Sequence, residues 1–595
     1  MTQAVRLQKM QSRWLFGLFA VLLAHGSQAN PILSPPKVAT EFIILHNNDM
    51  HARFDQTSVN SGTCPPEDAH TNKCYGGFAR VAHEVRMYRK EAQEGGTSVL
   101  YLNAGDTYTG TAWFTIFKDK IASAFLNKLK PDAISLGNHE FDERVEGLIP
   151  FLNDVTFPVL ACNLDLSKVP QLEATKHLAH SAILEANGTS IGVIGYLTPD
   201  TKKLTLNMDV EFNEEVESIN IEAKKLKAQG IKIIIALGHS GYLKDLEIAK
   251  SCPDVDIVIG GHTNTFLYTG AQPDAEHIDG PYPTMVKQHS GKEVPVVQAY
   301  AYTKYLGKLH VQFDANGNLL KWDGSPILLN ASVAQDQDLL DLLEVFRPNV
   351  TMLEKSVVGK TKVYLEGSKA VCRAEECNLG NLIADAMVAT RLLEDEGGYF
   401  WTDAAIALMQ GGGIRSSIEK RSDGDISIND LLSVLPWRNK LYLVPMPGSS
   451  IRRALERAAA LRGKDSDGGF LQVSGIHVVF NAHKPEGQRV VSVQVRCAAC
   501  RVPTYSDLND TAVYNVILGE FLLDGGDGHV FRHPAHQPQR LQNNDIEALK
   551  QYLGRRDYVY PEIEGRIVFI NSSSAALMGS AALLLISSLL IKMIT

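Results

Sequence analysis

The sequence has no excess of positive charge and no internal repeat. It carries 58 Lys and Arg against 67 Asp and Glu, a formal net charge of −9. Binding of a nucleic-acid polymer needs a basic surface, so this balance argues against such a partner. Only the two ends of the 595 residues are biased in composition, and 45% of the residues are hydrophobic. That length and apolar content favour two or more large globular domains.

The ends predict passage through the secretory pathway. Basic residues, a short apolar run and the small-x-small sequence Ser27-Gln28-Ala29 are typical of a signal peptide over residues 1–29. The alternative, a transmembrane anchor, needs a longer apolar run. Small residues at 571–574 followed by an apolar tail favour a GPI-attachment signal over residues 571–595, with a tail helix as the alternative. N-x-[ST] sequons at Asn187, Asn330, Asn349, Asn509 and Asn571 fit this route.

Cysteine is sparse, with eight residues in the chain. In an oxidising compartment disulfides are favoured over metal thiolates. Three local pairs stand out: Cys64 with Cys74, Cys372 with Cys377, and Cys497 with Cys500. The last is a C-x-x-C that lacks both a second C-x-x-C and thioredoxin-like surroundings, so we expect a structural bridge. Cys162 and Cys252 remain; their neighbours are typical of strand ends, and whether the two are free and buried stays open at this point.

Alternating apolar strands and helical stretches predict an α/β region from about residue 41 to residue 324. The expected strands are 42–45, 98–102, 133–136, 159–161, 191–196, 231–237 and 257–259, with helices over 78–94 and 216–229. Residues 335–352 have a separate helical pattern, with leucines and Phe346 on one face, typical of a connector or hinge. A second mixed α and β region follows from residue 357 to residue 570.

Polar residues with metal-binding chemistry follow five of the expected strands. They are Asp49 and His51, Asp106, Asn138 and His139, His239, and His262 with Asn264. Open α/β sheets bind ligands at the carboxyl ends of their strands, so we expect these side chains to meet at one edge. Carboxylate, imidazole and amide oxygen suit Zn or Mn, and Asp106 has two oxygens that could bridge cations about 3.5–4 Å apart. One such residue alone is more often solvated or a helix cap, but five clusters in this order indicate a two-metal site.

These clusters resemble the calcineurin-like metallophosphoesterases. The strings LHNNDMHARF, GNHEFD and VIGGHTNTFLYTG resemble the 5'-nucleotidase family, closest to animal GPI-anchored ecto-5'-nucleotidases, over nearly the whole mature chain. The resemblance implies a four-layer αββα domain at 40–330, a linker helix at 335–355 and a nucleotide-binding domain at 356–570. It assigns Asp49, His51, Asp106 and Asn264 to one metal and Asp106, Asn138, His239 and His262 to the other, with Zn expected.

The same resemblance implies a hydrolysis in which His139 and Asp142 take part. Asp142 would orient the imidazole, and His139 would stabilise the phosphoryl group or help the leaving group; the alternative for His139 is indirect support of the site. The expected reaction is hydrolysis of AMP to adenosine and phosphate by a metal-activated water. A homodimer, and a swing of the second domain about the linker helix, are also implied. Turnover by a protein whose domains are locked apart by an engineered disulfide would contradict that motion.

Substrate selection is expected in the second domain. The candidates are Arg373, Gln410, Arg415, Trp437, Phe521 and Asp527. From the residues alone, the G-G-G before Arg415 could be only a turn and Phe521 could belong to the core. The resemblance assigns the two aromatic residues to the base, Asp527 to the ribose hydroxyls and the arginines to phosphate.

The sequence departs from the usual family pattern in the second domain. Trp437 stands where Phe is usual, Gln410 where Asn is usual, and Ala384 and Ala407 where vertebrate-like members have a cysteine pair. Two other functions therefore stay open: apyrase-type hydrolysis of ATP and ADP, and an inactive binding ectodomain. The inactive ectodomain predicts lost metal ligands, whereas all seven are present.

Overall fold

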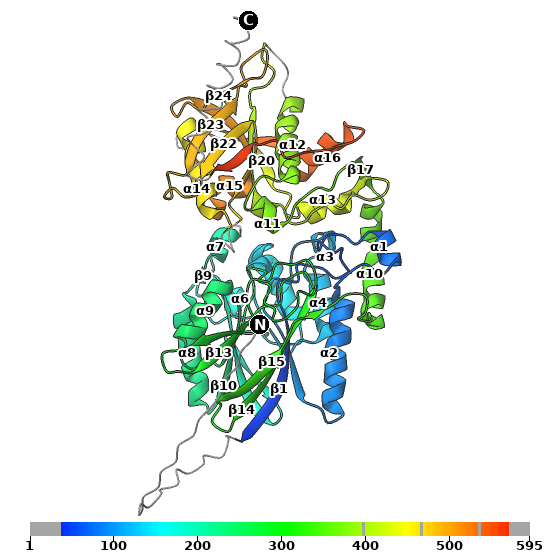
Figure 1. Ribbon diagram of the computed structural model, residues 1–595, viewed down its shortest axis with the longest axis vertical. Helices are drawn as coiled ribbons and strands as arrows, with labels where there is room; N and C mark the ends of the chain where they lie inside the picture. The colour runs from blue at the N-terminus through cyan, green and yellow to red at the C-terminus, as the bar shows by residue number, and fades with distance from the viewer. Residues whose placement is uncertain (1–36, 206–207, 395–398, 464–467, 533–536, 571–595) are drawn as a thin grey trace, which may run out of the picture. The chain divides into compact units, whose positions relative to one another are not determined.

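The first half of the chain builds two β-sheets from the apolar runs that the sequence predicts as strands. The computed structural model describes residues 37–205, 208–394, 399–463, 468–532 and 537–570 (Figure 1). One sheet has the order β15 (Leu319–Gly324), β14 (Tyr305–Asp314), β1 (Val38–Asn47), β2 (Ser98–Asn103), β3 (Ala133–Ser135), β4 (Val159–Leu160) and β6 (Leu178–Ala179), with β16 (Ile327–Leu328) on β14. The other has the order β12 (Thr284–Lys287), β13 (Glu293–Val297), β11 (Ile257–Ile259), β10 (Ile233–His239), β8 (Thr189–Leu197) and β7 (Ser181–Ala186).

These sheets pack face to face with helices outside, which gives four layers. Successive residues of a strand point to opposite faces. On β10, Ile233 and Ile235 lie in the core between the sheets, while Ile234 packs under helices α8 (Glu215–Ala228) and α9 (Tyr242–Ser251). The first sheet is covered in the same way by α2 (Phe78–Gln93), α4 (Asp119–Leu129) and α5 (Arg144–Asp154). In Figure 1, α8 and α9 lie on one side of the strands and α2 on the other. The expected αββα fold is confirmed.

Strand direction brings the polar residues together. β1, β2 and β3 run parallel, and so do β8, β10 and β11. Parallel neighbours end at the same edge of a sheet, so the segments after β1, β2, β3, β10 and β11 meet there.

The predicted connector is helix α10 (Gln337–Glu354). Leu339 and Leu343 are buried in the core beneath α2. The helix also packs against α13 (Ile428–Val434) of the second half. One helix therefore contacts both halves of the chain.

The second half contains a five-stranded and a four-stranded sheet. The first has the order β21 (Leu471–Ser474), β18 (Ile406–Gln410), β25 (Val513–Gly519), β20 (Lys440–Pro447) and β26 (Gln539–Asn544); the second has β24 (Tyr505–Asp507), β23 (Val490–Arg496), β22 (Ile476–Asn481) and β27 (Ile567–Ile570). Helices α12 (Asn378–Glu394) and α16 (Asp545–Gly554) share a core with one face of the first sheet. Its other face shares a core with α14 (Gly448–Leu461) and the second sheet.

Short elements complete the described residues. They are α1 (Pro66–His70), α3 (Ala112–Phe117), β5 (Leu164–Asp165), α6 (Pro170–Glu173), α7 (Thr201–Leu204), β9 (Glu211–Phe212), β17 (Val357–Lys360), α11 (Lys369–Cys372), β19 (Asp425–Ser427) and α15 (Glu520–Leu523), with 3-10 turns at His139–Phe141, Gly411–Gly413 and Gly526–Gly528.

The cysteine predictions are confirmed. Disulfides join Cys64 to Cys74, Cys372 to Cys377 and Cys497 to Cys500. Cys162 and Cys252 are free and buried. The expected signal peptide and GPI signal lie outside the described residues. Across the described ranges, no helix has the length and apolarity that crossing a bilayer requires.

Candidate two-metal site

The predicted metal ligands converge at the carboxyl edge of the two sheets. His239 Nε2 lies 2.8 Å from Asp106 Oδ2 and 3.7 Å from Asp49 Oδ1. His51 Nε2 lies 3.7 Å from Asp49 Oδ1 and 3.9 Å from Asp106 Oδ2. His262 Nδ1 lies 2.9 Å from Asn138 Oδ1. Asp106 therefore stands between two groups of donors, as a bridging carboxylate would.

Backbone geometry at this edge differs from ordinary loops. Asp49, His51, Asp106, His262 and Asn264 all have positive φ, between 46° and 79°. Non-glycine residues adopt this left-handed conformation at a cost, and such strain gathers at functional sites. The backbone at Gly137 lies close against Asp106, and a side chain at this position would not fit: a Cβ there would lie 2.2 Å from Asp106 Oδ1.

The donor atoms fit a divalent metal. Asp49 Oδ1 and Asn264 Oδ1 are buried and have no hydrogen-bond partner among the described residues, which is costly for a polar atom without another ligand. In two histidines, Nδ1 is hydrogen-bonded to a backbone carbonyl oxygen. His239 Nδ1 lies 2.6 Å from Ala104 O, and His51 Nδ1 lies 3.1 Å from Thr109 O. Donating from Nδ1 leaves Nε2 with a lone pair for a metal.

Electrostatics favour positive charge at this place. Burial lowers the pKa of His239, but the nearby Asp106 and Asp49 raise it to about 10. Burial, with Arg415, lowers the pKa of His51, and burial, with His239, lowers that of His262. The carboxylates thus create a field that attracts a cation, while two imidazoles stay neutral and able to bind one. Two overlapping donor groups, each within 4.8 Å, share Asp106: one adds His51 and His139, the other His239 and His262.

His139 and Asp142 form the predicted pair beside these donors. His139 Nδ1 lies 2.8 Å from Asp142 Oδ2, and the His139 amide donates to Asp106 Oδ1 at 2.9 Å. A carboxylate only accepts hydrogen bonds, so the proton lies on Nδ1 and Nε2 faces the site. Burial lowers the pKa of His139, but Asp142 and Asp106 outweigh it and the net direction is upward.

Glu140 is a residue that the sequence analysis missed. Its carboxylate is 1% exposed and accepts from four backbone N–H groups: Asp106 and Gly137 on Oε2, Thr107 and Tyr108 on Oε1, at 2.7–3.2 Å. It ties the segment after β2 to the segment after β3, and so places Asp106 against Asn138. The GNHE string contained the signal, but the sequence alone does not say which loop this carboxylate holds.

All six predicted substrate residues line one cavity with the metal-site residues. Its volume is about 520 Å³. The lining includes Arg373, Gln410, Arg415, Trp437, Phe521 and Asp527, together with His51, Asp106, Asn138, His139, Asp142, His262 and Asn264. Asp49 and His239 do not line it and are 0% exposed. Leu204, Thr205 and Asn439 also line the cavity and were not predicted.

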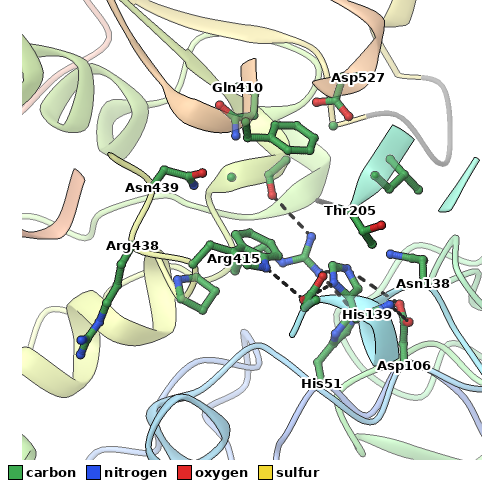
Figure 2. Close-up of a pocket in the computed structure, with 18 of the residues that line it drawn as sticks. His51, Asp106, Asn138, His139, Thr205, Gln410, Arg415, Arg438, Asn439 and Asp527 are labelled. Carbon is green, nitrogen blue, oxygen red and sulfur yellow. Dashed lines mark hydrogen bonds and ion pairs between the residues drawn. The ribbon is translucent and has the colours of Figure 1, made fainter. Parts of the chain in front are cut away.

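Arg415 crosses from the recognition wall, the side of the cavity lined by the six predicted substrate residues, to the metal site. Its Nη2 lies 3.4 Å from His51 Nε2 and 3.5 Å from His139 Nε2. Figure 2 shows this guanidinium beside His139 and His51, with Gln410 and Asp527 farther from the two histidines. The G-G-G before it forms a 3-10 turn, and a Cβ on Gly411 would lie 2.2 Å from Cys372 O. Glycine at 411 therefore lets this turn approach the backbone of the Cys372–Cys377 loop.

The aromatic candidates are positioned differently. Phe521 is only half-buried, and its ring lies against Gly526, where a Cβ would be 2.4 Å away. Phe521 lines the cavity, and its part in substrate recognition stays a prediction. Trp437 donates from Nε1 to Asp142 Oδ2 at 3.0 Å. Gln410 Oε1 is buried and, within the part of the chain that the structure describes, has no hydrogen-bond partner.

Comparison with known proteins finds relatives that match both halves of the chain. Residues 42–266 match the calcineurin-like phosphoesterase family, and residues 357–535 match the 5'-nucleotidase C-terminal domain. The chain is 49% identical over 534 residues to Protein 5NUC of Lutzomyia longipalpis, covering 89% of this chain and 93% of that one. It is 40% identical over 569 residues to the 5'-nucleotidase of Homo sapiens, covering 95% and 96%. The crystal structure of the 5'-nucleotidase precursor of Thermus thermophilus superposes with a TM-score of 0.79 at 34% identity, covering 89% and 99%.

Proposed function

The chain belongs to the 5'-nucleotidase family of calcineurin-like phosphoesterases, and from this premise we propose that it hydrolyses AMP to adenosine and phosphate outside the cell. One observation carries the proposal: a single cavity joins the donor cluster to the aromatic and arginine side chains, with Arg415 reaching between them. A phosphate at the donors and a base at the aromatic residues can then belong to one molecule.

Two divalent cations, which we propose to be Zn, would be held by the ligand sets assigned above. When bound they supply Lewis acidity, which lowers the pKa of an attacking water and neutralises phosphate charge. Asp106 and the orphaned oxygens of Asp49 and Asn264 supply the negative and dipolar ligands that such cations prefer.

The protein's own residues would then hold the phosphate and its leaving group. Arg415, with its planar fork of donors, takes phosphate oxygens next to His51 and His139, and Arg373 adds a second cation on the same wall. His139, held through Nδ1 by Asp142, presents Nε2 to the phosphoryl group and stabilises charge or protonates the leaving 5'-oxygen.

The remaining wall would select the nucleoside. Phe521 and Trp437 offer ring faces to a base, Asp527 lies where it can accept from ribose hydroxyls, and the buried Gln410 Oε1 can accept from a base N–H. Each role rests on the residue's place in the cavity lining and on the family resemblance.

Rim charges favour a monophosphate over a longer polyphosphate. Among the described residues, three lysines line the cavity. Lys369 donates to Thr263 O at 2.7 Å, whereas Lys118 contacts Glu143 and Lys440 contacts Glu520. In Figure 2 the Arg438 side chain points away from the other labelled residues. Additional phosphates would have to compete with these carboxylates for Lys118 and Lys440. We therefore propose AMP above ATP as substrate.

The test is phosphate release from AMP and from ATP, measured side by side on the full chain with and without chelator. We expect chelator-sensitive release from AMP and much slower release from ATP. Faster release from ATP would replace this function with an apyrase, and release from AMP that survives complete metal removal would contradict the metal-dependent chemistry.

We also propose that the protein is GPI-anchored at the outer face of the plasma membrane, glycosylated and homodimeric, with domains as assigned above. Three of the four described sequons, at Asn187, Asn349 and Asn509, are exposed, and Asn330 is partly so. Loss from the cell surface after treatment with a phosphatidylinositol-specific phospholipase tests the anchor, since a tail helix would resist it. A glycosidase mobility shift and the solution mass test glycosylation and dimerisation.

A further inference from the structure

Trp437 makes a hydrogen bond that its proposed role in base stacking does not require. Its indole Nε1 donates to Asp142 Oδ2 at 3.0 Å, across 295 residues of sequence. The side chain follows α13 in the second half of the chain, whereas Asp142 follows the 3-10 turn after β3 in the first. The bond therefore links the recognition wall directly to the residue that holds His139.

Asp142 Oδ2 is shared by two donors. It lies 2.8 Å from His139 Nδ1, and the Asp142 side chain is only 5% exposed. An indole N–H can only donate and a carboxylate can only accept, so this pairing has one possible polarity. With little solvent access, a carboxylate that loses one of its donors has little water to replace it.

The indole ring also contacts the other groups at this point. The Trp437 and His139 rings have centroids 5.7 Å apart and planes inclined by 27°, and the Arg415 guanidinium carbon lies 5.3 Å from the Trp437 centroid. One side chain thus contacts the imidazole, its carboxylate and the arginine proposed to hold phosphate.

The backbone after Trp437 is clamped in place. The Asn439 amide donates to Asp545 Oδ2 at 3.1 Å, and the Asp545 amide donates to Asn439 O at 3.0 Å. These bonds hold the backbone just after Trp437 to the start of α16.

We propose that Trp437 is a positioning residue for the His139–Asp142 pair: its N–H holds Asp142, and through it the imidazole, whenever the recognition wall lies over the metal site. The inference rests on the proposed phosphoesterase function. Phenylalanine at 437 would keep a ring and lose the donor, so the N–H and the stacking surface can be separated by one substitution.

The first test compares Trp437→Phe with Trp401→Phe on two substrates, AMP and p-nitrophenyl phosphate, which has no base or ribose. Trp401 is a matched control: its indole also donates to an oxygen, Cys497 O at 2.7 Å, and also lies near an arginine, Arg496. We expect Trp437→Phe to lower kcat roughly ten-fold on both substrates, with KM for AMP nearly unchanged, and Trp401→Phe to leave both alone.

A loss seen only with AMP, and mainly in KM, would overturn the inference and leave Trp437 as a stacking surface alone. No loss on either substrate would overturn it too. If the wild-type protein hydrolyses p-nitrophenyl phosphate and not AMP, the nucleotidase proposal fails while the aryl ester still tests Trp437.

A double-mutant cycle with Asp142→Ala is the second test, with folding of each variant checked by its melting temperature. If Trp437 acts through Asp142, adding Trp437→Phe to Asp142→Ala lowers kcat little further. If the two losses multiply in full, the residues act independently and the inference is wrong.

Discussion

The metal-binding edge and the recognition wall share one cavity but are built in different ways. At the edge, Asp49, His239, Asp106 and Asn138 are 0–3% exposed and lie at the ends of buried parallel strands. On the wall, Trp437, Arg415 and Phe521 are half-buried and come from turns far apart in sequence. The sheet thus positions the metal ligands, and loops position the residues proposed to recognise the substrate. We therefore expect substitutions at the edge to lower activity more than substitutions on the wall. Edge substitutions should act on metal binding and kcat/KM, and wall substitutions on KM.

Asp106→Asn should have the largest effect. The substitution removes negative charge from the carboxylate that stands between both donor groups, so we expect kcat/KM for AMP to fall about 1,000-fold or more, with loss of bound metal. Phosphate release and metal content measured together test this. Asp323→Asn is the matched control, because Asp323 also contacts an imidazole, that of His310 at 3.2 Å, but is exposed on the outer strands. More than a tenth of wild-type activity in Asp106→Asn would break the comparison.

Glu140→Gln should have an intermediate effect. An amide NH₂ would face backbone N–H groups that now point at a carboxylate oxygen, so the two ligand segments would separate. We expect metal affinity to fall about 10- to 100-fold, as for other residues that support metal ligands. Zinc titration of the metal-free protein measures this, and excess zinc should restore part of the activity. Glu222→Gln, at a partly buried carboxylate bonded to Ser181, is the control.

Phe521→Ala tests the recognition wall, where we expect a smaller effect that falls on KM. Loss of a ring face from the wall should raise KM for AMP about ten-fold, since stacking of a base on an aromatic ring contributes about 1–3 kcal/mol. Because Phe521 lies away from the metal ligands, kcat should change less than three-fold. Steady-state kinetics with AMP decide this. A fall in kcat with KM unchanged would show that the ring acts on the reaction and not on recognition.

The two regions also differ in how far sequence alone predicts them. The ligand residues could be predicted because each follows an apolar strand and parallel strands end together. Glu140 could not be assigned, because its role depends on which backbone N–H groups approach its oxygens. Phe521 looked equally suited to a core or a cavity, since only the turn at Gly526 decides which way the ring faces.

Long-range contacts between loops are the main part that the sequence left open. The Trp437–Asp142 bond joins residues 295 positions apart, and neither neighbourhood contains a pattern that names the other. The disulfides and α10 were predictable because short spacing or helical periodicity carries them. Which residues line the cavity depends instead on contacts between segments that are far apart in the sequence.

Asp545→Asn should have the smallest effect, and only on stability. Asp545 is buried at the start of α16 beneath the Trp437 segment, and burial raises its pKa to about 7 against the hydrogen bonds from Ile546 and Asn439 that lower it.

In the unfolded chain the same carboxyl titrates near its usual value of about 3.9. Between these values the folded state keeps a proton that the unfolded state releases, so this group's stabilisation is full at low pH and is lost as pH rises through 7, by at most about 1.4 kcal/mol per pH unit. Removing the group should therefore make the melting temperature depend less on pH between about 4 and 7, the window between the unfolded and folded pKa values, while KM for AMP at pH 7 stays within about two-fold. Unchanged pH dependence would mean that the carboxyl is ionised in the folded protein, and a large rise in KM would mean that the clamp on Asn439 matters for recognition as well as for folding.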